Sequence, residues 1–429
     1  MVGTTTNLEA FMHLVNGQIG SGILSMPKAF DDGGLIVAAI CTPVIGIITT
    51  YCVHLLVNVS EHVCEQLEIP IPDYEQLAEY TLAIGWSPVK KWSHLAKIVT
   101  SLFITLSQVG ACAVYYLFIA ENLKAFFDNL ANDTSNNNNN NTGFTMSLDM
   151  YLLILLPVIA LLQFIKNVRI LAIPSTLANL LQVLGLGIIF YNIVQFDPTT
   201  IGTRKQVGSK FPLYFVTTIF NFEGISIGMP LYKTMANPKA FARPITGIVD
   251  ITNIIIVSLN LFLGLFGYLK YGSDVGASVT FSMPNEPVYN SVQVMYGFAV
   301  LMTYPITMYV PIEMLWPKIN QRFIENKIST GTINFMEYIF RAACVLLTYA
   351  MALLIPHLDI ILSLVGALTS SSIQILIPAI LHTICFWPLC KSSKSRVLLF
   401  TKNLCIVAIG FAAFILGTYY SIVDLIAAI

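Results

Sequence analysis

Long blocks of apolar residues follow one another along the whole chain, separated by short polar segments. An α-helix needs about 20 apolar residues to cross a hydrocarbon core of about 30 Å. Strands of a membrane barrel would instead alternate apolar and polar residues over about ten positions. The pattern predicts eleven membrane-spanning helices, at 11–30, 35–59, 96–123, 149–165, 171–195, 212–235, 245–270, 290–315, 335–356, 358–388 and 400–426.

Composition supports this assignment. The 429 residues are 56% hydrophobic and 10% charged, with a mean hydropathy of +0.74, whereas a soluble domain carries about 25% charge. These values predict an all-α integral membrane protein surrounded by the lipid bilayer. They exclude a soluble enzyme and a secreted disulfide scaffold, and the net charge of -1 gives no indication of a nucleic-acid partner.

Basic residues set the expected orientation. With the N-terminus in the cytoplasm, 16 of the 22 Lys and Arg residues fall on the inner side and six on the outer side. Eleven spans then place the C-terminus outside or in a lumen. The asparagine-rich segment 128–148 becomes an outer loop, where Asn132 and Asn140 stand in glycosylation sequons.

Glycine and proline interrupt two spans in matching positions. The first span reads NGQIGSGILSMP, with Gly20, Ser21 and Gly22, and the sixth reads NFEGISIGMP, with Glu223 and Gly224. The two runs are five spans apart, so the halves have opposite orientations, which is typical of inverted-repeat transporters. The expected organisation is a short cytoplasmic N-terminus, two repeats and a final span, at 1–10, 11–195, 212–388 and 400–426.

Such interruptions have a direct chemical consequence. Unwound backbone exposes N–H and C=O groups that lipid cannot satisfy, so the breaks should line a cavity within the protein. Freed N–H groups suit a carboxylate and freed carbonyls suit an ammonium group. Two facing breaks therefore fit a zwitterionic amino acid, although a plain packing kink is the alternative for either break alone.

The same residues, together with four further segments, resemble the proton-coupled amino-acid transporters, a branch of the amino acid/auxin permease family in the APC superfamily. The matching segments include HLVNGQIGSGILSMPKAF at 13–30 and IFNFEGISIGMPLYKTMANPKAF at 219–241, followed by 303–317, 355–372 and 410–422, with SQVGACAVYYLFIAENL at 107–123. The resemblance implies a LeuT-like fold of five plus five inverted helices and one extra helix. It also implies symport of protons with small neutral amino acids such as glycine, alanine and proline. Asn16 and Asn221 depart from the family, which often has Lys and a small residue there.

The expected substrate site combines both breaks. Backbone N–H groups of Gly20, Ser21 and Gly22 should bind the substrate carboxylate, and a larger residue at either glycine should strain left-handed backbone angles and narrow the pocket. Backbone carbonyls of the sixth span should accept the amine, and aromatic rings there should limit substrate size; these residues are Phe220, Asn221, Phe222 and Gly224. Tyr304 in the eighth span is expected to line or gate the cavity, with plain packing as the alternative.

Two ionisable residues are candidates for proton coupling. Glu223 lies deep in a span, where an acid is a functional candidate by default, and a structural hydrogen bond is the alternative. His13 precedes the glycine motif and matches a family histidine, and imidazole exchanges protons near neutral pH. A hydrogen-bonded packing role is the alternative for His13.

Other chemistry has little support in the sequence. Residues 224–228 satisfy the G-x-S-x-G pattern of serine hydrolases, but that motif needs a strand–turn–helix setting, whereas here it lies in an apolar span. No enzyme activity, metal or cofactor is expected apart from the transported proton, and protein partners are not indicated. Alternative functions are a sodium-coupled or facilitative carrier and an amino-acid-sensing scaffold. The plasma membrane is the expected location, with an endosomal or lysosomal membrane as the alternative.

Overall fold

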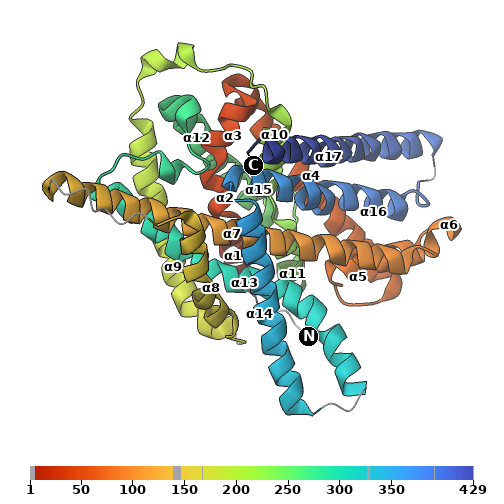
Figure 1. The fold of residues 1–429 in the computed structure, drawn as a ribbon. Coiled ribbons are helices and arrows are strands. Elements are labelled where there is room, and N and C mark those ends of the chain that lie inside the picture. Colours follow the sequence, from red (N-terminus) through yellow and green to blue (C-terminus); the bar gives the residue numbers. More distant parts are fainter. Residues whose placement is uncertain (1–4, 139–145, 167, 326–328, 391, 429) are drawn as a thin grey trace. The chain divides into compact units, whose positions relative to one another are not determined.

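The computed structural model describes residues 5–138, 146–166, 168–325, 329–390 and 392–428 (Figure 1). Regular structure within these residues is helical, apart from one parallel bridge between Thr5 and Met235. The α-helices are α1 Asn7–Gln18, α2 Ser21–Leu24, α3 Met26–Gly33, α4 Leu35–Leu67, α5 Tyr74–Ile84, α6 Ser87–Lys90, α7 Ser93–Asn138, α8 Leu148–Gln163, α9 Val168–Val194, α10 Phe211–Asn221, α11 Ile225–Thr234, α12 Ile248–Tyr271, α13 Pro287–Glu325, α14 Thr330–Leu354, α15 Leu358–Val365, α16 Ile377–Phe386 and α17 Ser393–Ala428. Short 3-10 helices cover Pro198–Thr203, Pro238–Ala240, Gly272–Asp274 and Val279–Phe281, and π-helical segments η5 Gly366–Ser370 and η6 Ser372–Leu376 join α15 to α16.

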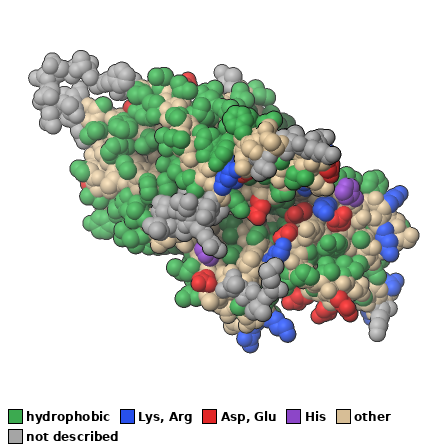
Figure 2. Space-filling view, turned by 90° about the horizontal axis from the view of Figure 1, so that it is seen from below, with side chains coloured by type: hydrophobic (Ala, Val, Ile, Leu, Met, Phe, Trp, Pro, Cys, Tyr) green, Lys and Arg blue, Asp and Glu red, His purple; other side chains and the backbone are tan. Residues whose placement is uncertain are grey.

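The helices have the length and composition of membrane spans. Among the described residues, eight helices are long and apolar enough to cross a bilayer. The three other predicted spans correspond to the two interrupted helices and to the shorter apolar helix α8, so the total of eleven stays a prediction. Figure 2 shows broad areas of hydrophobic side chains on one face, with charged side chains gathered apart from them, as expected for a protein that contacts lipid.

The structure differs from the sequence prediction in three places. Helix α7 continues to Asn138, into the segment predicted to be an outer loop. Helix α5 forms in the connection between the second and third spans, where the sequence indicated no element. The tenth span is π-helical over two segments instead of uniformly α-helical, and such bulges are frequent at functional sites.

Contacts divide the chain into two units. The first comprises Met1–Ile104, Lys205–Leu265 and Ser363–Ile429, and the second comprises Thr105–Arg204 and Phe266–Leu362. The first unit therefore contains both interrupted helices, together with α4, α5, α16 and α17. The second contains α8, α9, α13 and α14.

Small residues let helices of the first unit approach closely. Helix α10 packs against η5 and α17, and a Cβ atom on Gly366 would lie 2.3 Å from the Val216 carbonyl oxygen. A Cβ atom on Gly417 would come equally close to the Val216 side chain. These contacts fix the sixth span against the tenth, since lipid supplies no hydrophobic drive between helices and close packing must hold them.

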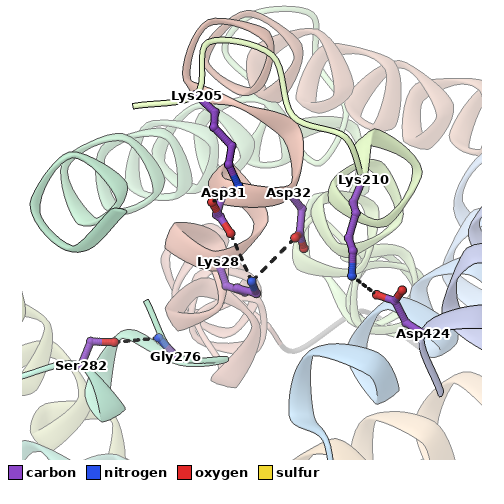
Figure 3. A network of polar contacts seen from close by, with 8 residues as sticks. All are labelled: Lys28, Asp31, Asp32, Lys205, Lys210, Gly276, Ser282 and Asp424. Carbon is purple, nitrogen blue, oxygen red and sulfur yellow. Dashed lines mark hydrogen bonds and ion pairs between the residues drawn. The ribbon is translucent and has the colours of Figure 1, made fainter. Parts of the chain in front are cut away.

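A charged cluster ties Lys205 to α3 (Figure 3). The Lys28 ammonium lies 3.2 Å from Asp31 and 3.8 Å from Asp32, and Lys205 lies 3.6 Å from Asp31. The backbone of Lys205 also bonds with the start of α4, where the Leu35 N–H donates to the Lys205 carbonyl at 2.8 Å. The first interrupted span is therefore anchored at the α3 end.

The second unit has its own polar core. The Arg341 guanidinium, which is 4% exposed, donates to Glu337 on the same helix and to the Gln163 carbonyl. Lys166 pairs with Glu337 at 2.7 Å. These contacts join α8 to α14 near one end of both helices.

Candidate substrate site at two helix breaks

Both glycine-containing runs interrupt their helices, as the sequence predicts. Helix α1 ends at Gln18 and α2 begins at Ser21, while α10 ends at Asn221 and α11 begins at Ile225. The expected left-handed backbone at the first break is wrong. Gly20 has φ −131° and is extended, and Gly22 has no positive φ either.

A side chain at Gly22 would displace a neighbouring amide. A Cβ atom on Gly22 would lie 2.1 Å from Asn221 Oδ1 and 3.3 Å from Phe220 Cδ1. The opposite contact mirrors this one, because a Cβ atom on Gly224 would lie 1.9 Å from Gln18 Nε2. Each break thus presents a glycine to a side-chain amide of the other break.

Several polar atoms at the breaks have no partner. Asn221 is 4% exposed, and both its Oδ1 and its Nδ2 lack a hydrogen bond. Gln18 Oε1 and Ser21 Oγ are likewise buried and unpartnered. Because a buried polar group without a partner costs about 1–3 kcal/mol, such a concentration at one place indicates a ligand site.

Backbone carbonyls of the sixth span are mostly engaged. The Phe220 carbonyl accepts from the Glu223 N–H at 3.1 Å, and the Gly224 carbonyl accepts from the Gly228 N–H at 2.7 Å. The Phe222 carbonyl accepts from the Gln374 side chain. Each of these three oxygens already has one donor.

Glu223 joins the sixth span to the tenth. Its carboxylate accepts a hydrogen bond from Ser226 Oγ at 2.8 Å and a second from Ser370 Oγ in η5. The neighbouring η6 segment makes two further hydrogen bonds. The Gln374 side chain donates to the Phe222 carbonyl, and the Ile373 carbonyl accepts from the Tyr74 hydroxyl at 2.6 Å. Glu223, a candidate proton-binding acid, is therefore hydrogen-bonded to serines of both the sixth and the tenth span.

His13 lies within α1, before the break that follows Gln18. Its side chain is exposed, and the nearby charge is that of Glu9. Glu9 forms a capping box with Thr6 at the start of the helix, which holds the pKa of Glu9 below its ordinary value of 4.5. The proton-coupling role of His13 stays a prediction.

The other predicted residues lie outside the two breaks. Tyr304 belongs to the second unit, where it is fully buried and its hydroxyl lies 2.7 Å from Thr348 Oγ1. Asn132 falls in the helical residues of α7, and Asn140 lies outside the described residues. Their roles in gating and glycosylation stay predictions.

A small cavity borders the breaks on the Gln18 side. It has a volume of about 10 Å³, and its lining includes Gln18, Phe222, Gly224 and Asn253. That is about the space of one water molecule. This cavity is therefore too small for an amino acid.

Sequence reasoning overlooked several polar residues near this cavity. Gln18 lies in the glycine-containing run of the first span, eight residues before the Met of Met-Pro. Asn221 has the same position in the sixth span. This shared position was the signal from which Gln18 could have been predicted as a site residue. His54 is another such residue, and its Nε2 lies 2.7 Å from Asp250 Oδ1 on α12. One turn away, Asn253 donates to Thr50 at 2.9 Å, so two polar contacts join α4 to α12.

Comparison with known proteins decides the family. The family model for transmembrane amino acid transporter proteins matches residues 3–423. The chain belongs to this amino acid transporter family. Within it, the proton-coupled amino acid transporter-like protein pathetic of Drosophila melanogaster is 30% identical over 99% of this chain and 86% of its own length. The probable amino acid transporter skat-1 of Caenorhabditis elegans is 28% identical over 97% of this chain and 89% of its own.

A solved structure supports the fold. The closed conformation of Mhp1, a nucleobase-cation-symport-1 family transporter with bound bromovinylhydantoin, matches with a TM-score of 0.53 at 11% identity, covering 98% of this chain and 92% of that one. The likeness concerns the fold alone. Together these findings make the chain a multi-pass membrane transporter of the LeuT-like fold, with amino acids as substrates, and not an enzyme.

Proposed function

We propose that the protein is a secondary-active symporter, which moves small neutral amino acids of the glycine, alanine and proline class together with protons by alternating access. The observation that carries the proposal is the pair of facing breaks, where Asn221 approaches Gly22 and Gln18 approaches Gly224, and where side-chain atoms of Gln18, Ser21 and Asn221 are buried without a partner. Their close contacts leave little room, which favours small substrates. The printed name of the Drosophila relative adds support for proton coupling.

Glu223 would carry the coupling proton in this proposal. As a carboxylate it accepts hydrogen bonds from two serine hydroxyls, one of them on η5. A protonated carboxyl group has its own O–H to donate, so one hydroxyl would have to turn away. Proton binding would then alter the contact between the sixth and tenth spans, which provides a physical link between protonation and movement of the broken helix.

His13 is the second candidate for the proton, on the cytoplasmic half of the first span. We assign it the release step toward the cytoplasm, because it is exposed and an imidazole exchanges protons near neutral pH. In the proposed orientation the N-terminus is cytoplasmic, the C-terminus is outside or lumenal, and the plasma membrane is the favoured location.

Uptake of radiolabelled glycine, alanine and proline tests the proposal. Cells that express the chain at their surface would be compared at about pH 5.5 and about pH 7.5, with sodium or choline outside. Uptake should rise at the acidic pH and should not depend on sodium. Sodium dependence would contradict proton coupling, and binding without uptake would favour a sensor of amino acids.

A further inference from the structure

Two stretches of the first unit, 80–104 and 363–423, carry positive charge without negative charge. Together they contain seven Lys and Arg residues and neither Asp nor Glu. The seven are Lys90, Lys91, Lys97, Lys391, Lys394, Arg396 and Lys402. Positive charge therefore gathers wherever the fold brings the two stretches together.

Two tryptophans mark the place where they meet. Trp86, directly before α6, and Trp387, directly after α16, have ring centroids 6.1 Å apart. Trp387 also packs against Phe400 of α17, with centroids 5.7 Å apart. Figure 1 shows α6 at the same end of the first unit as the end of α16 and the start of α17. The basic residues that follow each tryptophan in the sequence therefore belong to one surface.

We call this surface the basic rim, and its members are Trp86, Trp92, Trp387, Lys90, Lys91, Lys394 and Arg396. Trp86 is 45% exposed and Trp92 is 52% exposed, and all four basic side chains are exposed. Lys97 nearby pairs with Glu79 at 2.6 Å, whereas among the described residues the four basic members form no ion pair. Lys391 lies outside the described residues. The charge of the rim is thus left for an anion from outside the protein.

Two contacts within the rim keep charge beside aromatic or backbone groups. The Lys91 ammonium lies 5.5 Å from the centre of the Trp92 ring. Arg396 Nε donates to the Cys390 carbonyl at 2.9 Å. Neither contact removes the positive charge.

Apolar side chains continue from the rim along α17. Val397 is 62% exposed, Leu398 is 72% exposed and Phe400 is 45% exposed. Tryptophan is enriched where the hydrocarbon core meets the headgroups, and groups of Lys and Arg directly beyond a spanning helix attract anionic lipids. An acidic soluble protein would match the charge but would leave these apolar side chains uncovered.

We infer that the basic rim binds the headgroup of an anionic phospholipid, with phosphatidylserine as the representative. The lipid phosphate and carboxylate accept hydrogen bonds from the lysines and the arginine, and the acyl chains lie along the apolar residues at the start of α17. The orientation predicted from the basic residues places the rim on the cytoplasmic side, where the leaflet is anionic. The site uses no residue of the two helix breaks and does not depend on the transport reaction.

Fluorescence quenching by brominated lipids tests the inference, because three of the four tryptophans belong to the rim. Trp316→Phe removes the fourth. Purified protein with this change is placed in phosphatidylcholine bilayers that contain either brominated phosphatidylserine or brominated phosphatidylcholine. Brominated phosphatidylserine should quench at a several-fold lower fraction of the lipid. High salt should reduce this preference, because it screens charges at the surface.

Removal of the basic side chains should remove the preference. Each single change of a basic member to Gln should lower it by up to about fivefold. The combined variant Lys90→Gln, Lys91→Gln, Lys394→Gln and Arg396→Gln should be quenched equally by both lipids. Its emission spectrum and thermal unfolding show whether it is folded.

Lys318→Gln together with Arg322→Gln is the matched control. Both residues are exposed near the end of α13, but Glu313 and Glu325 flank them in the sequence. Their loss also removes two positive charges and should leave the quenching of the rim tryptophans unchanged.

Two results would overturn the inference. One is equal quenching of the unsubstituted rim by both lipids, and the other is a preference that survives in the combined variant. Equal quenching together with binding of polyglutamate that the combined variant loses would assign the rim to an acidic protein instead. None of these measurements involves transport, so the symporter proposal stands or falls separately.

Discussion

Asn221 occupies the space that a side chain at Gly22 would need. Its Oδ1 lies 2.1 Å from the position of a Cβ atom on that glycine, although the two residues are far apart in the sequence. The contact joins the first interrupted span to the sixth at the point where the substrate should bind. It makes both residues sensitive to small changes of volume.

Gly22→Ala should reduce amino-acid uptake at least about tenfold, because the new methyl group forces Asn221 out of its position. Shortening the opposing side chain with Asn221→Ser in the same protein should restore part of the activity. Gly187→Ala, where nothing lies within 4 Å of the added Cβ, serves as the control and should have full uptake. Equal uptake by Gly22→Ala and the control would contradict the steric account.

Glu223→Gln should separate transport from proton coupling. The amide keeps the size of the side chain and an acceptor for Ser226 or Ser370, but it cannot exchange a proton. We expect exchange of labelled for unlabelled substrate to continue, while the rise of uptake at acidic pH disappears. Ser226→Ala removes one donor and keeps the acid, so it should shift the pH profile without abolishing it. An unaltered pH profile in Glu223→Gln would exclude this residue as the coupling group.

His13→Ala should abolish concentrative uptake if His13 releases the proton to the cytoplasm. Downhill equilibration of substrate should survive, because the His13 side chain is exposed on α1 and does not belong to the contact between Gly22 and Asn221. Accumulation ratios measured in cells at acidic outside pH provide the test. Full proton-driven accumulation by His13→Ala would refute the assignment.

The start of α1 should depend on pH through Glu9. Thr6 holds the pKa of Glu9 below 4.5, so its stabilisation is complete above that value and is lost as the pH falls through the lowered pKa. Thr6→Ala removes the hydroxyl but keeps the backbone N–H that donates to the Glu9 carboxylate. It should therefore raise the Glu9 pKa part of the way toward 4.5 in an NMR titration of the 13C-labelled protein, with the signal assigned by Glu9→Gln. Thr5→Ala should leave the titration unchanged, because the Thr5 hydroxyl bonds with Thr234 instead. An unchanged Glu9 pKa in Thr6→Ala would contradict the capping account.

Much of the fold could be predicted because hydropathy and helix-breaking residues act locally. Apolar length located the long spans, and the Met-Pro runs located both breaks. The π-helical segments could not be predicted in this way, since they depend on contacts of Ser370 and Gln374 with a different span. Helix α7 continues beyond its apolar residues into a polar segment, because polar residues do not by themselves end a helix.

The candidate site was predictable in location and less so in chemistry. Glycine spacing located the breaks. It could not show that Gly22 matters for its lack of a side chain and not for its backbone angle, because this depends on Asn221, which approaches from the other repeat. Likewise, the contact of His54 with Asp250 could not be predicted, because Asp250 is on another helix. Long-range pairings of this kind leave no mark on the local pattern.

Purified protein in liposomes tests the central claim most directly. With the lumen near neutral pH and the outside about two units more acidic, labelled glycine should accumulate inside above its outside concentration without sodium. Collapsing the proton gradient with an ionophore should release it. Equilibration without accumulation, or accumulation that needs sodium, would contradict proton-coupled symport.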